Sequence, residues 1–193
     1  EDLKNKKNKY DIVKEEALIE FEGEFSDDPS SLKDCNFFVV TVPTPVDEKN
    51  KPDLSAIIGA TEQLAEMLTK GAIVCYESTV YPGTTEEICV PILEKVSKLT
   101  YNVDFFVGYS PERMNPGDEM HTVENIVKVT SGSTEAAADI IDKFYRNILN
   151  VSTFKATSIM VAEASKILEN AQRDVNIAFM NEMAVFFDKI GIE

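Results

Sequence analysis

The chain has 193 residues, of which 44% are hydrophobic, enough for one domain with a real core or for one domain plus an extension. Its formal net charge of −15 would repel a nucleic-acid backbone or an anionic membrane surface, which argues against both kinds of partner. No apolar run approaches the roughly 18 residues of a membrane-spanning helix, and we expect no secretory leader.

The first residues alternate between charged and apolar segments. Residues 1–16 are highly charged and fit the tail of a helix or a surface segment, and residues 17–25 alternate well enough for a short strand. Asp, Ser and Pro at 26–34 predict a turn and a helix start. Residues 35–42 are a continuous apolar run, which favours a strand buried on both faces of a parallel sheet.

Predicted helices and strands then alternate along the chain, at lengths that fit βαβ units. Helices are predicted at three ranges: 53–71, 84–99 and 133–149. Further strands are predicted at four ranges: 72–79, 105–110, 125–132 and 151–156. The sequence therefore predicts an α/β fold with a mostly parallel sheet.

From Thr157 or Ser158 onward the sequence predicts one long helix, with no proline and no glycine before Gly191. It is longer than most helices within a domain, and its apolar surface has to be buried against a second domain, a second subunit or both. We therefore divide the chain into an α/β domain at 1–156 and a long helix at 157–193, and expect a homodimer through that helix.

Three loops at predicted strand ends carry the residues that point to chemistry. They are TVPTP at 41–45, ESTVYPGTTE at 77–86 and YSPERMNPGD at 109–118. In an open parallel sheet, ligands bind beyond the carboxyl ends of the strands, and three successive loops of this kind would converge there. Thr84 also opens a helix whose free N–H groups could face an anion. Each loop alone fits ordinary turn chemistry, but the three together favour one shared site.

A polar stripe on the long helix is the fourth candidate. Glu163, Lys166, Asn170 and Arg173 fall at i, i+3, i+7 and i+10, which places them on one side of the helix. By spacing alone, a solvated face with ordinary ion pairs explains the pattern too. However, Asn is a poor choice for an exposed helix interior, and an Asn one turn beyond a Lys supplies a pair of donors for an oxyanion.

The cysteines and the histidine limit the remaining chemistry. Cys35, Cys75 and Cys89 lie beside apolar residues without CxxC spacing, so we expect reduced, mostly buried thiols in a cytoplasmic protein rather than disulfides or zinc. The single histidine, His121, excludes a His-rich metal site by count, and no GxSxG motif accompanies it. We therefore predict no metal site.

The motifs VTVPTP, YESTVYPGTTEE, VGYSPERMNPGD and VAEASKILENAQRDVNIAFMNE resemble, in order, those of the UDP-glucose/GDP-mannose dehydrogenase family. The sequences ESTVYPG and SPERMNPGD most resemble its UDP-N-acetylhexosamine 6-dehydrogenase branch, which makes uronic acids for bacterial capsules and O-antigens. The resemblance covers nearly the whole chain. It implies an incomplete Rossmann-like NAD-binding domain followed by one long central helix.

The activity that the resemblance implies is an NAD-dependent four-electron oxidation of a UDP-N-acetylhexosamine. The C6 alcohol would become an aldehyde and then a cysteine thioester, which water cleaves to the uronic acid. By that likeness, the NAD site would be lined by residues of the first two loops: Val42, Pro43, Thr44, Ser78 and Thr79. Thr79 would also hold the water for hydrolysis, and Glu112 would be the general acid/base.

The same resemblance implies contacts with the UDP-sugar. Lys166 and Asn170 match the pair that stabilises the oxyanion at C6, and Arg113 and Arg173 would contact the anionic substrate, with Glu112 beside them. The expected partners are thus a UDP-sugar and a second copy of the chain.

Several parts of the family pattern are absent from these 193 residues. The Gly-rich GxGxxG turn would precede residue 1, the acidic residue that binds the adenosine ribose is absent as well, and the catalytic cysteine would follow residue 193 in a GGxC-type loop. We therefore assign the nucleophile to none of the three cysteines, and expect these residues alone to bind NAD weakly and turn over nothing. Other branches have a second acidic residue where this chain has Pro116, so a two-carboxylate water relay is in doubt.

Two other interpretations fit parts of the sequence. Dehydrogenases of the β-hydroxyacid or 6-phosphogluconate type also place a Lys, three residues and then an Asn on the helix after a nucleotide domain, but would not be expected to share SPERMNPGD. A non-catalytic module that dimerises through its long helix would need none of these polar side chains. The residues that distinguish UDP-GlcNAc from UDP-GalNAc would lie largely outside this chain.

Overall fold

The computed structural model describes residues 19–113, 126–149 and 152–192, and the chain divides into two compact units, 1–34 and 35–193. The described part of the first unit holds a short 3-10 helix, η1 (Pro29–Leu32). Asp28 caps this helix by accepting a hydrogen bond from the Ser30 N–H at 2.9 Å, which agrees with the predicted turn and helix start.

The strand predicted at 17–25 is wrong for the residues that the structure describes. Ile19 and Glu20 are helical, and residues 21–25 belong to no strand. The alternating apolar side chains of Ile19 and Phe21 are exposed rather than packed. A strand needs a partner backbone for its hydrogen bonds, and alternation alone does not supply one.

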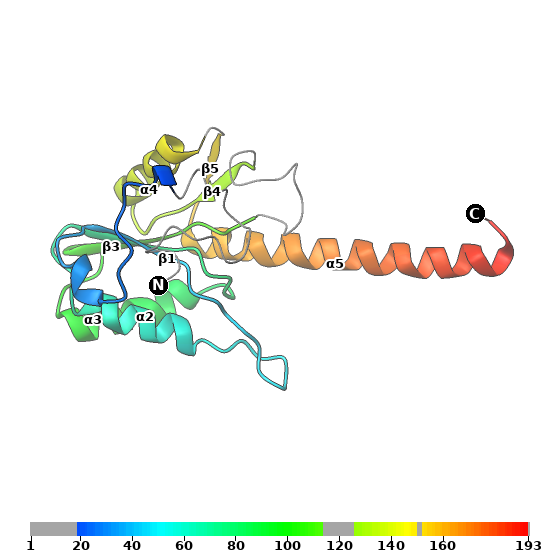
Figure 1. The fold of residues 1–193 in the computed structure, drawn as a ribbon, viewed down its shortest axis with the longest axis horizontal. Helices are drawn as coiled ribbons and strands as arrows, with labels where there is room; N and C mark the ends of the chain where they lie inside the picture. The colour runs from blue at the N-terminus through cyan, green and yellow to red at the C-terminus, as the bar shows by residue number, and fades with distance from the viewer. Residues whose placement is uncertain (1–18, 114–125, 150–151, 193) are drawn as a thin grey trace. The chain divides into compact units, whose positions relative to one another are not determined.

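The second unit is built on a parallel sheet with the strand order β1-β2-β3 (Figure 1). Its strands are β1 (Phe37–Val40), β2 (Ala72–Tyr76) and β3 (Phe105–Tyr109). The register pairs Val40 with Tyr76 and Tyr76 with Tyr109, so the three strands end level with one another. The loops that follow them therefore share one edge of the sheet.

Helices cover both faces of this sheet (Figure 1). On one face lie α2 (Ser55–Ala65), the π-helical turn η2 (Thr85–Cys89) and α3 (Val90–Ser97); on the other lies α4 (Glu135–Ile148). The central strand β2 is buried along its whole length, as predicted for a parallel sheet. In β1, however, Val39 is 38% exposed, because β1 is an edge strand within the described part of the chain.

A second parallel pair, β4 (Lys128–Thr130) and β5 (Thr153–Lys155), is separate from the three-stranded sheet. The strands are parallel as predicted, but they form two sheets rather than one. An antiparallel bridge between Gly108 and Gly132 connects them. At Gly108 a Cβ atom would lie 2.4 Å from the Ser131 carbonyl oxygen, so this close crossing requires glycine.

The long helix α5 (Ile159–Ile190) confirms the prediction for the end of the chain. Ser158 caps its start by accepting from the Val161 N–H, and Gly191 ends it with a left-handed φ of 71°. One side of its first turns, with Ile159, Ala162 and Glu163, is buried, whereas most side chains beyond Asn170 are exposed. Figure 1 shows the helix running away from the sheet. Within the described ranges, no helix is long and apolar enough to cross a membrane.

Candidate functional site

A cavity of about 440 Å³ lies beyond the carboxyl ends of β1, β2 and β3. Residues of all three loops line it: Thr41, Val42, Pro43, Thr44, Glu77, Ser78, Thr79 and Glu112. The level strand ends bring these loops together, which is the convergence expected from the sequence. All five residues predicted to bind the cofactor line this one cavity, while their roles stay predictions.

The first two loops are held together by Ser78. Its hydroxyl donates a hydrogen bond of 2.7 Å to the Val42 carbonyl, and its own carbonyl accepts one from the Tyr109 hydroxyl. The Ser78 side chain thus fixes the shape of the 41–45 loop. Thr44 differs, because its Oγ1 is buried and has no hydrogen-bond partner among the described residues. A buried hydroxyl without a partner is costly, so this atom fits a polar ligand in the cavity.

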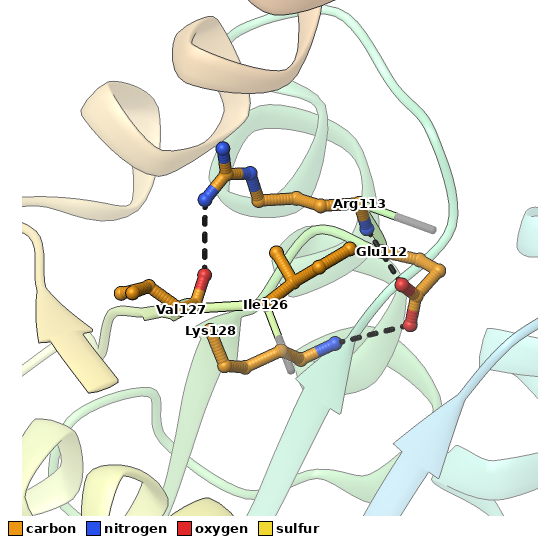
Figure 2. Close-up of a pocket in the computed structure, with 5 residues that line it drawn as sticks. All are labelled: Glu112, Arg113, Ile126, Val127 and Lys128. Atoms are coloured by element: carbon orange, nitrogen blue, oxygen red, sulfur yellow. Dashed lines mark hydrogen bonds and ion pairs between the residues drawn. The ribbon is translucent and has the colours of Figure 1, made fainter. Parts of the chain in front are cut away.

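The Glu112 carboxylate lies at the edge of the cavity and is held at both oxygens (Figure 2). Its Oε1 accepts a hydrogen bond of 2.7 Å from the Arg113 backbone N–H. Its Oε2 lies 3.6 Å from the Lys128 ammonium, which is also 3.4 Å from Oε2 of Glu77. A buried lysine on β4 therefore sits between two carboxylates that line the cavity.

Sequence reasoning missed Glu77 and Lys128. Glu77 directly follows β2 and precedes Ser78, so its place in the second loop was a signal that could have identified it. Lys128 interrupts the otherwise apolar strand that was predicted at 125–132, and a charged residue in such a strand needs a partner. Nothing in the sequence, however, indicates which carboxylates that partner would be.

Lys166 of α5 reaches the loop that carries Glu112. Its ammonium donates a hydrogen bond to the Glu112 backbone carbonyl, which joins the long helix to the loop after β3. Burial lowers the pKa of Lys166, while the nearby carboxylates of Glu169 and Glu112 act in the opposite direction. The structure thus brings together Glu112 and Lys166, as the sequence-based hypothesis requires.

The next residues on α5 form a charged network around Glu169. Its carboxylate pairs with Arg113 at 2.8 Å and with Arg173 at 3.0 Å. Arg173 also donates to the Asn170 side-chain oxygen at 3.3 Å. The two arginines predicted to contact substrate therefore share one carboxylate, a partner that sequence analysis did not identify.

Glu163 belongs to the polar stripe by spacing but has a different function in the fold. It is fully buried and accepts hydrogen bonds from the Gly83 N–H at 2.6 Å, the Thr85 N–H at 2.9 Å and the Thr85 hydroxyl at 2.7 Å. The N–H groups of Gly83 and Thr85 at this helix start thus face an anion, as the sequence suggested. The anion is a carboxylate of the protein itself, which anchors α5 to the second loop.

The cysteines are free, as expected. Cys75 and Cys89 are buried, and burial raises the pKa of their thiols to about 12 and about 11. Cys35, just before the edge strand β1, is exposed, so two of the three thiols are buried, in line with the prediction of mostly buried cysteines. The two buried thiols are too weakly acidic to act as nucleophiles near neutral pH.

No group of potential metal ligands occurs within the described ranges. The remainder of the third loop, which includes Pro116, lies outside the described residues, and so does His121. The sequence-based predictions that concern those two positions are therefore not addressed by the fold.

Residues 10–149 match the NAD binding domain of the UDP-glucose/GDP-mannose dehydrogenase family, and residues 160–193 match its central domain. The chain is 54% identical over 181 residues to the UDP-N-acetyl-D-glucosamine 6-dehydrogenase of Pseudomonas aeruginosa, covering 94% of this chain and 42% of that protein. It is 50% identical over 192 residues to protein CapL of Staphylococcus aureus, covering 100% of this chain and 45% of that protein.

Solved structures show the same relationship. The structure of UDP-D-ManNAc dehydrogenase from Pyrococcus horikoshii matches with a TM-score of 0.80 at 37% identity, over 86% of this chain and 39% of that chain. The chain therefore spans less than half the length of the relatives that it matches.

Proposed function

Because this chain belongs to the UDP-glucose/GDP-mannose dehydrogenase family, we propose that the whole protein oxidises the C6 alcohol of a UDP-N-acetylhexosamine to the uronic acid with NAD. The names of the relatives from Pseudomonas aeruginosa and Pyrococcus horikoshii support an N-acetylated sugar nucleotide as the substrate class. The observation that carries the proposal is the contact between Lys166 and the Glu112 loop at the edge of the cavity.

The residues of the cavity fit a polar cofactor such as NAD. The buried hydroxyl of Thr44 has no hydrogen-bond partner among the residues that the structure describes, and a ligand hydrogen bond there would remove the cost of leaving it unpaired. Val42, Pro43, Ser78 and Thr79 would form the rest of the wall against the cofactor. When bound, NAD supplies the hydride acceptor, while these residues orient it and exclude water.

The reacting groups of the substrate would then face Glu112, Lys166 and Asn170. Glu112 would move protons as general acid/base, and Thr79 would hold the water that cleaves the thioester formed on a cysteine outside this chain. The Lys166 ammonium and the Asn170 amide would donate to the oxygen at C6 as negative charge develops there, each contributing about 3 kcal/mol. Arg113 and Arg173 would contact the anionic part of the substrate.

We further propose that the chain divides at residues 156–157 into an NAD-binding domain and a central helix, and that the helix forms a homodimer. The family matches end at residue 149 and begin again at residue 160, which agrees with that boundary. Large apolar side chains of α5 are exposed, among them Val175, Ile177, Phe179, Met180 and Phe186. So many exposed large apolar side chains on one helix favour a partner that covers them.

The apolar surface of α5 could instead be covered by a further domain of the same protein. Light scattering of the purified whole protein distinguishes the two, since a monomeric mass would exclude the dimer. A cytoplasmic location is part of the same proposal, and the free cysteines support a reducing compartment.

The decisive experiment is a stoichiometric assay of the whole protein with NAD and either UDP-GlcNAc or UDP-GalNAc. We expect two NADH for each sugar nucleotide consumed and a uronic acid as product. One NADH for each substrate would favour chemistry of the β-hydroxyacid type, and no NAD reduction with any sugar nucleotide would favour a non-catalytic module. The Lys166→Met variant should lose activity in the same assay, with Lys70→Met, at an exposed position after α2, as the control.

A further inference from the structure

Lys128 is a buried cation that the proposed reaction does not use directly. Its side chain is only 7% exposed, and taking an ammonium out of water costs several kcal/mol unless it is paired. Two carboxylates supply that pairing, Glu77 at 3.4 Å and Glu112 at 3.6 Å, and its ammonium lies 5.0 Å from the centre of the Tyr145 ring. These contacts come from three different elements, so the lysine links β4 to the ends of β2 and β3.

Each of the two carboxylates also accepts a hydrogen bond on its other oxygen. Oε1 of Glu77 accepts from the Tyr145 hydroxyl, and Oε1 of Glu112 accepts from the Arg113 backbone N–H. Lys128 contacts the second oxygen of both carboxylates, and Figure 2 shows its contact with Glu112. Without its positive charge, two carboxylates that face the same cavity would repel each other and Glu112 would turn away from its present position.

Lys128 does not line the 440 Å³ cavity, although both of its partners do. It lines a separate space of about 10 Å³ together with Glu112, Arg113, Ile126 and Val127 (Figure 2). That space has room for at most one water molecule, so no cofactor or substrate fits beside the lysine. Within the described residues, Lys128 reaches the larger cavity through its contacts with Glu112 and Glu77.

We propose that Lys128 is a positioning residue, whose ammonium holds the Glu112 carboxylate at the edge of the cavity by balancing it against Glu77. This inference rests on the proposed function, in which Glu112 is the general acid/base. Both ion-pair distances exceed those of a short charge-assisted hydrogen bond, so the lysine acts by its charge and its fixed place. It holds the carboxylate where a proton can be exchanged with the substrate, and takes no part in bond making.

A double-mutant cycle on the whole protein tests the inference. Lys128→Met, Glu112→Gln and the double variant are compared in kcat, measured as NADH formed from NAD and the sugar nucleotide. We expect Lys128→Met alone to lower kcat by about 10- to 100-fold, with KM changed by less than about threefold. In the Glu112→Gln background, the same change should alter kcat by less than about twofold, because no carboxylate remains to be positioned.

The outcomes separate the two proposals. If Glu112→Gln keeps the normal kcat, the proposed role of Glu112 is refuted and the inference about Lys128 with it. If Glu112→Gln is impaired but Lys128→Met causes the same loss in both backgrounds, Lys128 only supports the fold, and this inference alone is wrong.

Two further variants keep the test valid if Lys128→Met does not fold. Lys128→Arg preserves the charge and should restore most of kcat. The pair Lys128→Met and Glu77→Gln removes one buried charge of each sign, so its fold should be retained while Glu112 still lacks its cation. We expect this pair to be folded by circular dichroism and to have a kcat at least about threefold below that of the unmodified protein, because Glu112 still lacks its cation although the repulsion from Glu77 is gone. A normal kcat in the pair would overturn the inference.

Discussion

Replacing Glu163 by glutamine should destabilise the fold more than replacing any other carboxylate of α5 by its amide. The Glu163 carboxylate is fully buried and accepts three hydrogen bonds from the turn before α3. Glutamine has nearly the same shape, but one of its two ends is an N–H₂ group, which would point at an N–H donor. One charge-assisted hydrogen bond, worth about 1.5–3 kcal/mol, is lost, and the other two become weaker neutral ones.

The net loss is smaller than the sum of these effects, because a neutral amide is cheaper to bury than a carboxylate. We expect the free energy of unfolding to fall by about 3 kcal/mol. Urea unfolding of the whole protein, followed by circular dichroism, measures it. Glu62→Gln is the matched control, since Glu62 is exposed on α2 and should change stability by less than about 0.5 kcal/mol. Equal stability of the Glu163 and Glu62 variants would refute the anchoring role of Glu163.

Three other predictions concern the site, a backbone crossing and the thiols. Lys166→Met should lower kcat of the whole protein by about 100- to 1,000-fold, because an oxyanion donor is lost, and steady-state kinetics would measure it. Gly108→Ala should lower the free energy of unfolding by several kcal/mol, as overpacking of a core does, since a Cβ would lie 2.2 Å from a neighbouring side chain. Gly59→Ala is the control: a Cβ at this position in α2 meets open space, so the same urea unfolding should show unchanged or higher stability. Cys75 and Cys89 should resist thiol reagents at pH 8 until the protein unfolds, as mass spectrometry of labelled peptides would show. Burial raises their pKa above the ordinary 9.0, to about 12 and about 11, so above pH 9 the thiols ionise in the unfolded chain before they do in the folded one. The thiols should therefore not lower the free energy of unfolding below pH 9, and should lower it progressively as pH rises toward 11.

Much of the fold could be predicted from local patterns. The apolar runs gave β1 and β2, and the cap at Ser158 and the left-handed Gly191 marked both ends of α5. These features depend on residues a few positions apart, so the sequence contains them directly. The expected strand at 17–25 shows the limit of this reasoning, because pairing with a distant backbone is not a local property.

The candidate site, too, was predicted in part from local patterns and in part not. The three loops were recognised because parallel strands end at a common edge, a rule that needs only the order of strands and helices. The stripe on α5 was recognised from spacing, but spacing does not reveal what each side chain faces. Glu163 faces the backbone of the second loop, whereas Lys166, less than one turn later, reaches Glu112.

The sequence by itself therefore determined the elements, their order and the loops that form the cavity, because periodicity, caps and strand-end topology are short-range information. Only the tertiary structure decided that Glu163 anchors α5, that Glu169 pairs with both arginines, and that Lys128 lies between two carboxylates. Those contacts join residues that are distant in the chain, 54 positions apart for Lys166 and Glu112 and 80 for Glu163 and Gly83. Such pairs meet only when the core packs, since packing fixes which charged groups are buried together.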